Sequence, residues 1–198
     1  PGEQDTAAQR GLAFGRKTYR HYEGGAVVAQ DILALLAEPT LHAEPRALTS
    51  LTLTELGELL RYFGRFTSDE RILPKYTWAS PGALYATQLY LELVGIAGIA
   101  SGIYYYHPLK HQLVRCADAA VHAGAYFGCH FIGKKAAIEP IYKNNIEEVL
   151  NFEAGHMQGV LDEVLPGFGL GIAAQTLRPE VKAQLDVANE DYYLTSCR

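Results

Sequence analysis

The feature that most constrains the fold is a long helix predicted from Asn145 to Leu165. Asn145 is placed to cap the first turn, and Glu148 follows at the spacing of a capping box. Apolar residues then recur on one broad face of the predicted helix. The Pro166-Gly167 pair ends the pattern because proline cannot continue a helix.

Two glycines lie inside this predicted helix, at Gly155 and Gly159. Each glycine destabilises a helix by about 1 kcal/mol relative to alanine. That cost is understandable if another helix crosses closely at these positions. A subunit interface is one candidate for such a crossing.

The rest of the chain mixes strands and helices without a regular β-α-β rhythm, which favours an α+β layer arrangement over a doubly wound sheet. Residues 1–14 show little pattern and are expected to form a loose arm, and residues 169–174 read as a short buried strand or turn. The predicted strands cover residues 84–94, 103–116 (bent back at 107–110), 126–132 and 191–197, and the predicted helices cover residues 30–37, 54–66 (capped by Thr54), 145–165 and 179–185.

The composition excludes several classes of protein. A length of 198 residues fits one domain, and a net charge of −5 with scattered basic residues argues against nucleic acid as the main partner. The longest apolar run is too short to span a membrane. Only Cys116, Cys129 and Cys197 are cysteines, without a C-x-x-C pair, so we expect neither a disulfide framework nor a zinc ribbon, and a reducing, cytoplasmic setting.

The chain starts at Pro1 and shows no basic segment followed by an apolar one, so no signal peptide is expected. The missing initiator methionine suggests a domain excised from something longer.

A cationic segment near the N-terminus is the first candidate binding site. In an extended backbone, Arg16, Thr18 and Arg20 share one face, with Lys17 between them, so two guanidinium groups and a hydroxyl would converge on one anion. A phosphate monoester fits that clamp, and a solvated basic turn fits the same residues equally well. No Walker loop or G-x-G-x-x-G motif accompanies the segment.

The second candidate site is Lys75-Tyr76, just before a turn at Ser80-Pro81-Gly82. Both side chains are poor acids, with ordinary pKa values of about 10, so their adjacency suggests tuned proton transfer. A surface lysine beside a half-buried tyrosine is the alternative interpretation. Neighbours in a regular strand point to opposite faces, so both can reach one substrate only if the backbone here is irregular.

The histidines indicate less. His107 and His111 flank a turn and not a helix face, so no metal site is expected, and His156 reads as a helix-packing residue. No G-x-S-x-G nucleophile elbow is present.

Taken together, three blocks resemble the FMN-dependent nitroreductase-like family, in the branch of thiazoline oxidases and of oxidase domains from non-ribosomal peptide synthetases. Residues 16–20 resemble the family's R-x-S-x-R phosphate clamp, with Thr18 in place of serine. Residues 75–85 resemble the K-Y…S-A-G-x-L-Y block, with Pro81 in place of alanine. Residues 153–171 resemble the A-G-H…G-L-G block. Within the branch, residues 76–93, 102–114 and 140–157 look most like the oxidase domains of indigoidine synthetases.

The resemblance implies one oxidase domain over residues 1–198, with a central antiparallel or mixed sheet flanked by helices. It also implies a homodimer with FMN at the subunit interface. Arg16, Lys17, Thr18 and Arg20 would then hold the FMN phosphate, and the remaining cofactor-binding residues would be Ser80, Pro81, Gly82, Gly169, Leu170 and Gly171. Relatives commonly continue past the position of Arg198 into an arm that adds phosphate contacts, so this fragment is expected to hold FMN less tightly.

The implied reaction is a dehydrogenation of an aminoacyl or peptidyl thioester tethered to a carrier protein. A base drawn from Tyr76, with its pKa lowered by Lys75, would remove the Cα proton while a hydride leaves Cβ for the flavin, and molecular oxygen would reoxidise the flavin. The substrate would be a glutaminyl thioester or its lactam. Three alternatives stay open: oxidation of a thiazoline or oxazoline, an NAD(P)H-dependent nitro- or flavin reductase, and a non-catalytic dimerisation module.

Overall fold

The computed structural model describes residues 43–68 and 71–198. The predicted arm at residues 1–14, the predicted helix at residues 30–37 and the cationic segment at Arg16 lie outside the described residues. Within the described part, no helix is both long and apolar enough to cross a membrane.

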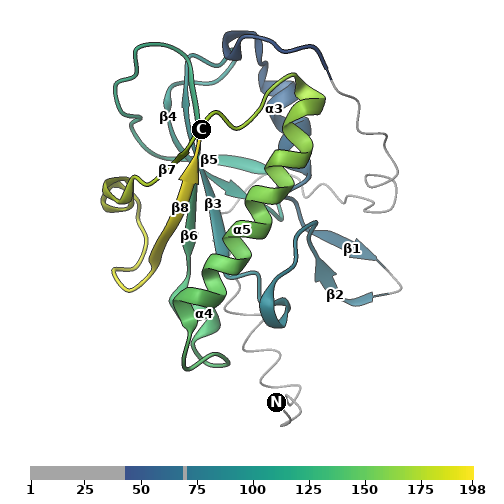
Figure 1. Cartoon of the computed structure of the whole chain (residues 1–198), viewed down its shortest axis with the longest axis vertical. Coiled ribbons are helices and arrows are strands. Elements are labelled where there is room, and N and C mark those ends of the chain that lie inside the picture. The colour runs from purple at the N-terminus through teal and green to yellow at the C-terminus, as the bar shows by residue number, and fades with distance from the viewer. Residues whose placement is uncertain (1–42, 69–70) are drawn as a thin grey trace.

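A six-stranded antiparallel sheet forms the centre of the structure, in the order β5-β4-β3-β6-β8-β7. The fold is therefore α+β, as predicted. A separate antiparallel pair, β1-β2, lies to one side (Figure 1). The strands are β1 (Phe66–Ser68), β2 (Arg71–Lys75), β3 (Thr87–Val94), β4 (Gly102–His107), β5 (Gln112–Ala117), β6 (Tyr126–Gly133), β7 (Gln175–Thr176) and β8 (Tyr192–Cys197).

Helix α5 (Ile146–Val164) crosses one face of this sheet, over β3, β6 and β8 (Figure 1). The long helix was predicted nearly to the residue. Asn145 precedes it but adopts a left-handed conformation, and its side chain makes no capping hydrogen bond, so that detail of the prediction was wrong. At Gly155 and Gly159, no atom of the described chain lies within 4 Å of the position that a Cβ would take. The crossing expected at these glycines is therefore not made by the described part of the chain.

Helix α3 (Leu53–Arg61) and the short helix α4 (Lys135–Ile138) complete the α-helices of the described residues. The cap of α3 was predicted at Thr54 but lies at Thr52, whose hydroxyl accepts a hydrogen bond from the Glu55 backbone while the Glu55 carboxylate accepts one from Thr52. This reciprocal pairing is a capping box, which satisfies two backbone donors of the first turn. The 3₁₀ turns are η1 (Leu48–Ser50), η2 (Pro81–Ala83), η3 (Leu165–Phe168) and η4 (Pro179–Gln184).

The core has two parts, one on each face of the sheet. Alternate residues of a strand point to opposite faces, so Leu89 and Leu91 pack into the larger cluster that includes α5, and Tyr90 packs into a smaller one with Val181 of η4. Strand β3 is buried along almost its whole length because β4 and β6 flank it.

Candidate active site

The chain between β2 and β3 is irregular, as the pairing of Lys75 with Tyr76 in one site requires. Strand β2 ends at Lys75, and no regular element follows until η2. Gly82 has a φ of 62°, Ala83 of 54° and Tyr85 of 51°. Left-handed conformations at residues other than glycine cost about 1 kcal/mol or more and concentrate at functional sites. The strained turn is thus a candidate site on structural grounds alone.

Tyr76 lies in a buried aromatic cluster. Its ring centroid is 4.3 Å from that of Tyr85 and 4.8 Å from that of Trp78, and its side chain is only 6% exposed. The Tyr85 phenol hydrogen-bonds to the Tyr76 backbone, while burial raises the pKa of Tyr85. Burial also raises the pKa of Tyr106, and the nearby Tyr76 raises it further. Lys75 is half-buried at the strand end and makes no ion pair with another described residue.

Ser80 joins this turn to helix α5 through a buried carboxyl group. Its hydroxyl oxygen accepts a hydrogen bond of 2.7 Å from the Tyr85 backbone and hydrogen-bonds to Glu153. Thr87 donates a second hydrogen bond of 2.8 Å to Glu153 Oε2. The indole of Trp78 also faces this carboxyl group, although neither its N–H nor Glu153 Oε1 has a well-aligned partner.

Burial raises the pKa of the Glu153 carboxyl group, which is 1% exposed. The hydrogen bonds from Ser80 and Thr87 and the nearby Trp78 indole offset only part of that rise. A carboxyl group accepts hydrogen bonds in both protonation states and donates one when protonated, so Glu153 can hold the Ser80 hydroxyl in either state.

The sequence analysis did not select Glu153 as a functional residue, although a signal was present. On helix α5, Glu153 follows Leu150 by three residues and precedes Met157 by four, so it lies on the buried face. A single carboxyl group on an otherwise apolar helix face indicates a buried polar partner.

The predicted residues Pro81 and Gly82 lie at the surface of the same turn. Gly82 is exposed, and its positive φ favours glycine. The hydrogen bonds of the turn use the N–H groups of Ala83, Leu84 and Tyr85. The Tyr142 hydroxyl lies 3.5 Å from the position that a Cβ on Gly82 would take, so one side of this glycine is already covered by an aromatic side chain.

The predicted residues Gly169, Leu170 and Gly171 lie elsewhere. Gly169 ends η3 with a φ of 66°, and a Cβ there would collide with the Glu44 carbonyl. The three residues line a cavity of about 290 Å³ beside Leu161. Leu161 is eight residues beyond Glu153, which is about 12 Å along a helix. The described chain thus does not bring the two predicted cofactor-binding segments together.

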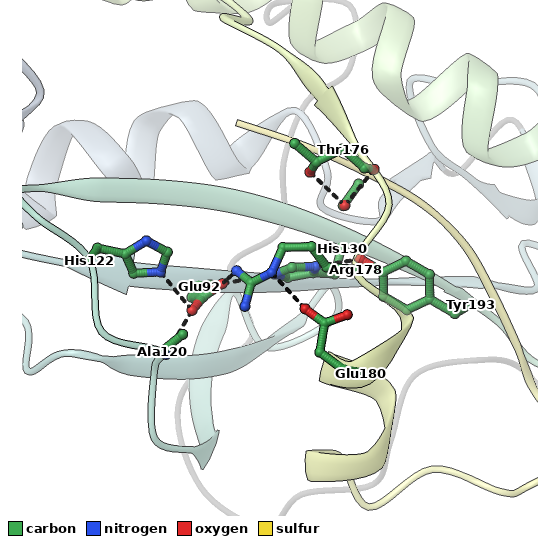
Figure 2. Close-up of polar contacts among 9 residues, drawn as sticks. Glu92, Ala120, His122, His130, Thr176, Arg178, Glu180 and Tyr193 are labelled. Carbon is green, nitrogen blue, oxygen red and sulfur yellow. Dashed lines mark hydrogen bonds and ion pairs between the residues drawn. The ribbon is translucent and has the colours of Figure 1, made fainter.

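A second buried glutamate lies on the opposite face of the sheet (Figure 2). Glu92 is 0% exposed and accepts hydrogen bonds of 2.6 Å from Arg178, 2.9 Å from His122 and 2.8 Å from the Ala120 N–H. His130 Nε2 is 3.4 Å away. The nearby His130 imidazole, the hydrogen bonds from His122 and Ala120 and the charge of Arg178 together outweigh burial and hold the pKa of Glu92 at about 2.

This ionised cluster fastens the edge segments to the sheet. Figure 2 shows Glu92 between His122 and Arg178, with Tyr193 beyond His130. The Tyr193 hydroxyl is 2.8 Å from His130 Nδ1, and Arg178 also pairs with Glu180 of η4 at 3.0 Å. None of the predicted site residues belongs to this group.

Comparison with known proteins identifies relatives along the whole chain. An indigoidine synthase of Dickeya dadantii is 55% identical over 197 residues, and one of Streptomyces lavendulae is 52% identical over 193 residues. These alignments cover 100% and 98% of this chain but only 13% and 15% of the relatives. No protein-family model matches.

Solved structures show the same fold. A protein of Ralstonia eutropha described as a nitroreductase superposes with a TM-score of 0.60 and 17% identity, over 90% of this chain and 86% of that one. A chain of the E. coli microcin synthetase McbBCD complex superposes with a TM-score of 0.53 and 14% identity, over 99% of this chain and 80% of that one. The chain has a nitroreductase-like fold and is homologous to one segment of indigoidine synthases. The predicted resemblance to nitroreductase-like synthetase domains is thereby confirmed.

Proposed function

We propose that this nitroreductase-like domain is an FMN-dependent oxidase that introduces a Cα–Cβ double bond into an aminoacyl thioester carried by a synthetase. The observation that carries the proposal is the 55% identity along the whole chain to an indigoidine synthase. A glutaminyl thioester, or the lactam formed from it, is the substrate we infer from that relationship. The strained turn at Ser80 and the buried Glu153 behind it, whose pKa is raised by burial, support the position of the site.

The turn fits a flavin ring in two respects. Exposed Gly82 offers side-chain-free backbone, and the Ser80 hydroxyl is fixed beside it by the Tyr85 N–H and by Glu153. Backbone N–H groups and hydroxyls aimed at a ring edge can stabilise charge there. When bound, FMN would supply the acceptor for the hydride from Cβ. Arg16, Lys17, Thr18 and Arg20 would hold its phosphate, with Gly169–Gly171 contributed at a subunit interface.

Lys75 and Tyr76 would handle the proton. The thioester carbonyl acidifies the Cα–H bond, so a base takes that proton as the pair of electrons left behind forms the new double bond. The Tyr76 phenol borders a cavity of only about 20 Å³, room for about one water. Lys75 is more exposed. We therefore assign contact with the substrate to Lys75. Tyr76 would hold the proton, and it could contact the substrate directly only if a neighbouring aromatic ring moved aside.

The dimer is part of the proposal. Phe152 is 61% exposed on α5, and no atom of the described residues lies within 4 Å of the Cβ positions of Gly155 and Gly159 on the same helix. A second subunit seated there would cover the apolar ring and explain both glycines. Molecular oxygen is proposed as the final electron acceptor and the carrier protein as the partner that delivers the substrate.

The first experiment is the visible spectrum of the purified whole protein, with the released cofactor identified by mass. FMN bands support the proposal, and a colourless protein that does not take up FMN rejects it in favour of a non-catalytic module. Anaerobic bleaching of the flavin by NADPH alone would instead indicate a reductase.

The second experiment tests the residues. Lys75→Ala and Tyr76→Phe should each abolish turnover of the carrier-bound substrate while the protein stays yellow. Arg115→Ala, at an exposed cation on β5, is the control and should retain full activity. Full activity in both site variants would remove this pair from the mechanism.

A further inference from the structure

Strands β6 and β8 bring two of the three cysteines face to face. Cys129 and Cys197 are directly opposite partners in this antiparallel pairing, and both thiols are free. Residues directly opposite each other in antiparallel strands have Cα atoms about 4.5–5.5 Å apart, and their side chains share one face. Disulfides span Cα distances of about 4.4–6.8 Å. The two strands can therefore accept a disulfide at this position without moving apart.

The two thiols are chemically unequal. They hydrogen-bond to each other, and this bond raises the pKa of Cys129, which burial raises further, while it lowers the pKa of Cys197. The thiolate is the reactive form of cysteine. Cys197 is thus the better nucleophile of the pair, and Cys129 is placed to attack it in a second step.

A cavity gives access to both sulfur atoms. The cavity of about 290 Å³ is lined by Cys129 and Cys197 and reaches the surface at the exposed residues Gly171 and Arg198. Its remaining wall is largely apolar, including Phe127 and the α5 residue Leu161. A water occupies about 30 Å³ of liquid volume, so such a space holds several waters and can admit a small hydroperoxide.

We propose that Cys129 and Cys197 form a reversible dithiol–disulfide site that a hydroperoxide oxidises through this cavity. The Cys197 thiolate attacks one peroxide oxygen, the O–O bond breaks, and hydroxide leaves as Cys197 becomes a sulfenic acid. Cys129 then attacks that sulfur, an S–S bond forms, and the hydroxyl group leaves as water. Two thiols lose two electrons and hydrogen peroxide becomes two waters. A thiol reductant reverses the step by disulfide exchange.

The disulfide would fix the wall of the cavity. The backbone of Ala173 and Ala174 donates to the Arg198 carbonyl, and Arg198 donates back to Ala174, so the segment after Gly171 is attached to the residue that follows Cys197. Linking Cys197 to β6 would anchor that segment to the centre of the sheet. The disulfide chemistry does not require the oxidase activity, but its cavity is also lined by Gly169–Gly171, which are assigned above to cofactor contacts. An oxidase that reduces oxygen would release hydrogen peroxide, which this pair of thiols would consume.

Peptide mapping of the whole protein tests the inference. The reduced protein is treated with hydrogen peroxide near stoichiometry, the remaining thiols are alkylated, and the digest is analysed by mass spectrometry. The expected product is a Cys129–Cys197 cross-linked peptide pair, lighter by two hydrogens and separated by dithiothreitol. Cys116, half-buried on β5, should stay alkylated as an internal control.

Variants assign the order of the two steps. Cys129→Ala should stop at a sulfenic acid on Cys197 that dimedone traps, whereas Cys197→Ala should lose the peroxide reaction, and Cys116→Ala should behave as the wild type. Full alkylation of Cys129 and Cys197 after peroxide, or unchanged peroxide reaction in Cys197→Ala, would overturn the proposal. Because the cross-link is sought in the wild-type protein, a variant that fails to fold leaves the test intact.

Discussion

Two glutamates are equally buried on opposite faces of the same sheet, and their pKa values are shifted in opposite directions. Glu153 faces hydroxyl groups and an indole, and its pKa is raised. Glu92 faces a guanidinium, two imidazoles and a backbone N–H, and its pKa is about 2. Burial favours the neutral form of both carboxyl groups, so the companions decide the outcome. The surroundings on one face of the sheet therefore favour a protonated carboxyl group, and those on the other face favour an ionised one.

The largest expected effect on stability comes from replacing each glutamate by glutamine, because the two losses should differ. Glu92→Gln removes the negative partner of Arg178 and should lower the free energy of unfolding by about 3 kcal/mol. Glu153→Gln replaces a neutral acid by a neutral amide and should cost less than about 1 kcal/mol. Urea unfolding followed by circular dichroism measures both. Equal losses would show that the two carboxyl groups have the same charge.

The pH dependence of stability should have opposite signs at the two positions. The folded-state pKa of Glu92 is depressed, so its contribution is present above the ordinary value of 4.5 and is lost as pH falls toward about 2. The folded-state pKa of Glu153 is raised, so its contribution is present below the ordinary value of 4.5 and is lost as pH rises through the folded value.

Urea midpoints across the acidic range measure this difference. The gap between wild type and Glu92→Gln should close as pH falls below 4.5. Relative to Glu153→Gln, the wild type should lose stability as pH rises above 4.5. A gap for Glu92→Gln that widens on acidification would contradict the assignment.

Removing the Thr87 hydroxyl, which donates a hydrogen bond to Glu153, should have a smaller effect on stability. Thr87→Val keeps the shape of the side chain but removes the 2.8 Å hydrogen bond that Thr87 donates to Glu153. We therefore expect a loss of about 1–2 kcal/mol in unfolding free energy. Thr49→Val, on an exposed turn, is the matched control and should change stability little. A loss no larger than in the control would mean that Glu153 does not depend on Thr87.

The smallest effect on stability is expected at Tyr193, at the edge of the Glu92 cluster. Tyr193→Phe removes the hydroxyl that lies 2.8 Å from His130 Nδ1 and should cost about 1 kcal/mol, seen as a lower melting temperature. Tyr192→Phe, at the neighbouring tyrosine on β8, should leave the melting temperature unchanged. Equal shifts in the two variants would exclude a specific role for the His130 contact.

The fold was largely predictable because its main elements carry local patterns. Helix α5 and strands β3, β4, β5, β6 and β8 were expected near their observed positions, from periodicity and from the turn at His107 and Pro108. The cap of α3 was misplaced because Thr52 and Thr54 both precede helix-forming residues. Only the hydrogen bond that the Glu55 carboxylate accepts from the Thr52 backbone distinguishes them. The strands β1 and β2 were not predicted, since three to five residues give little periodicity.

The candidate site was predictable only in part. Lys75, Tyr76 and the turn at Ser80 were selected from the sequence, and the structure shows the irregular backbone that they require. Their roles stay predictions. The burial of Tyr76 among aromatic rings depends on residues that only the folded chain brings together.

The Glu92 cluster was beyond sequence reasoning for the same reason. Its partners Ala120, His122 and Arg178 lie 28, 30 and 86 residues away along the chain. No local spacing connects them. Such a group can be recognised only once the order of the strands is known.

Strand β3 carries contacts to both glutamate clusters, through Thr87 on one face and Glu92 on the other. A slip of one residue in its pairing with β6 would turn every side chain of β3 to the wrong face. Thr87 would then leave Glu153 without its donor, while Arg178 would meet a leucine. The two polar clusters thus help to fix the register of the central strand, because a shift in its alignment would break hydrogen bonds on both faces of the sheet at once.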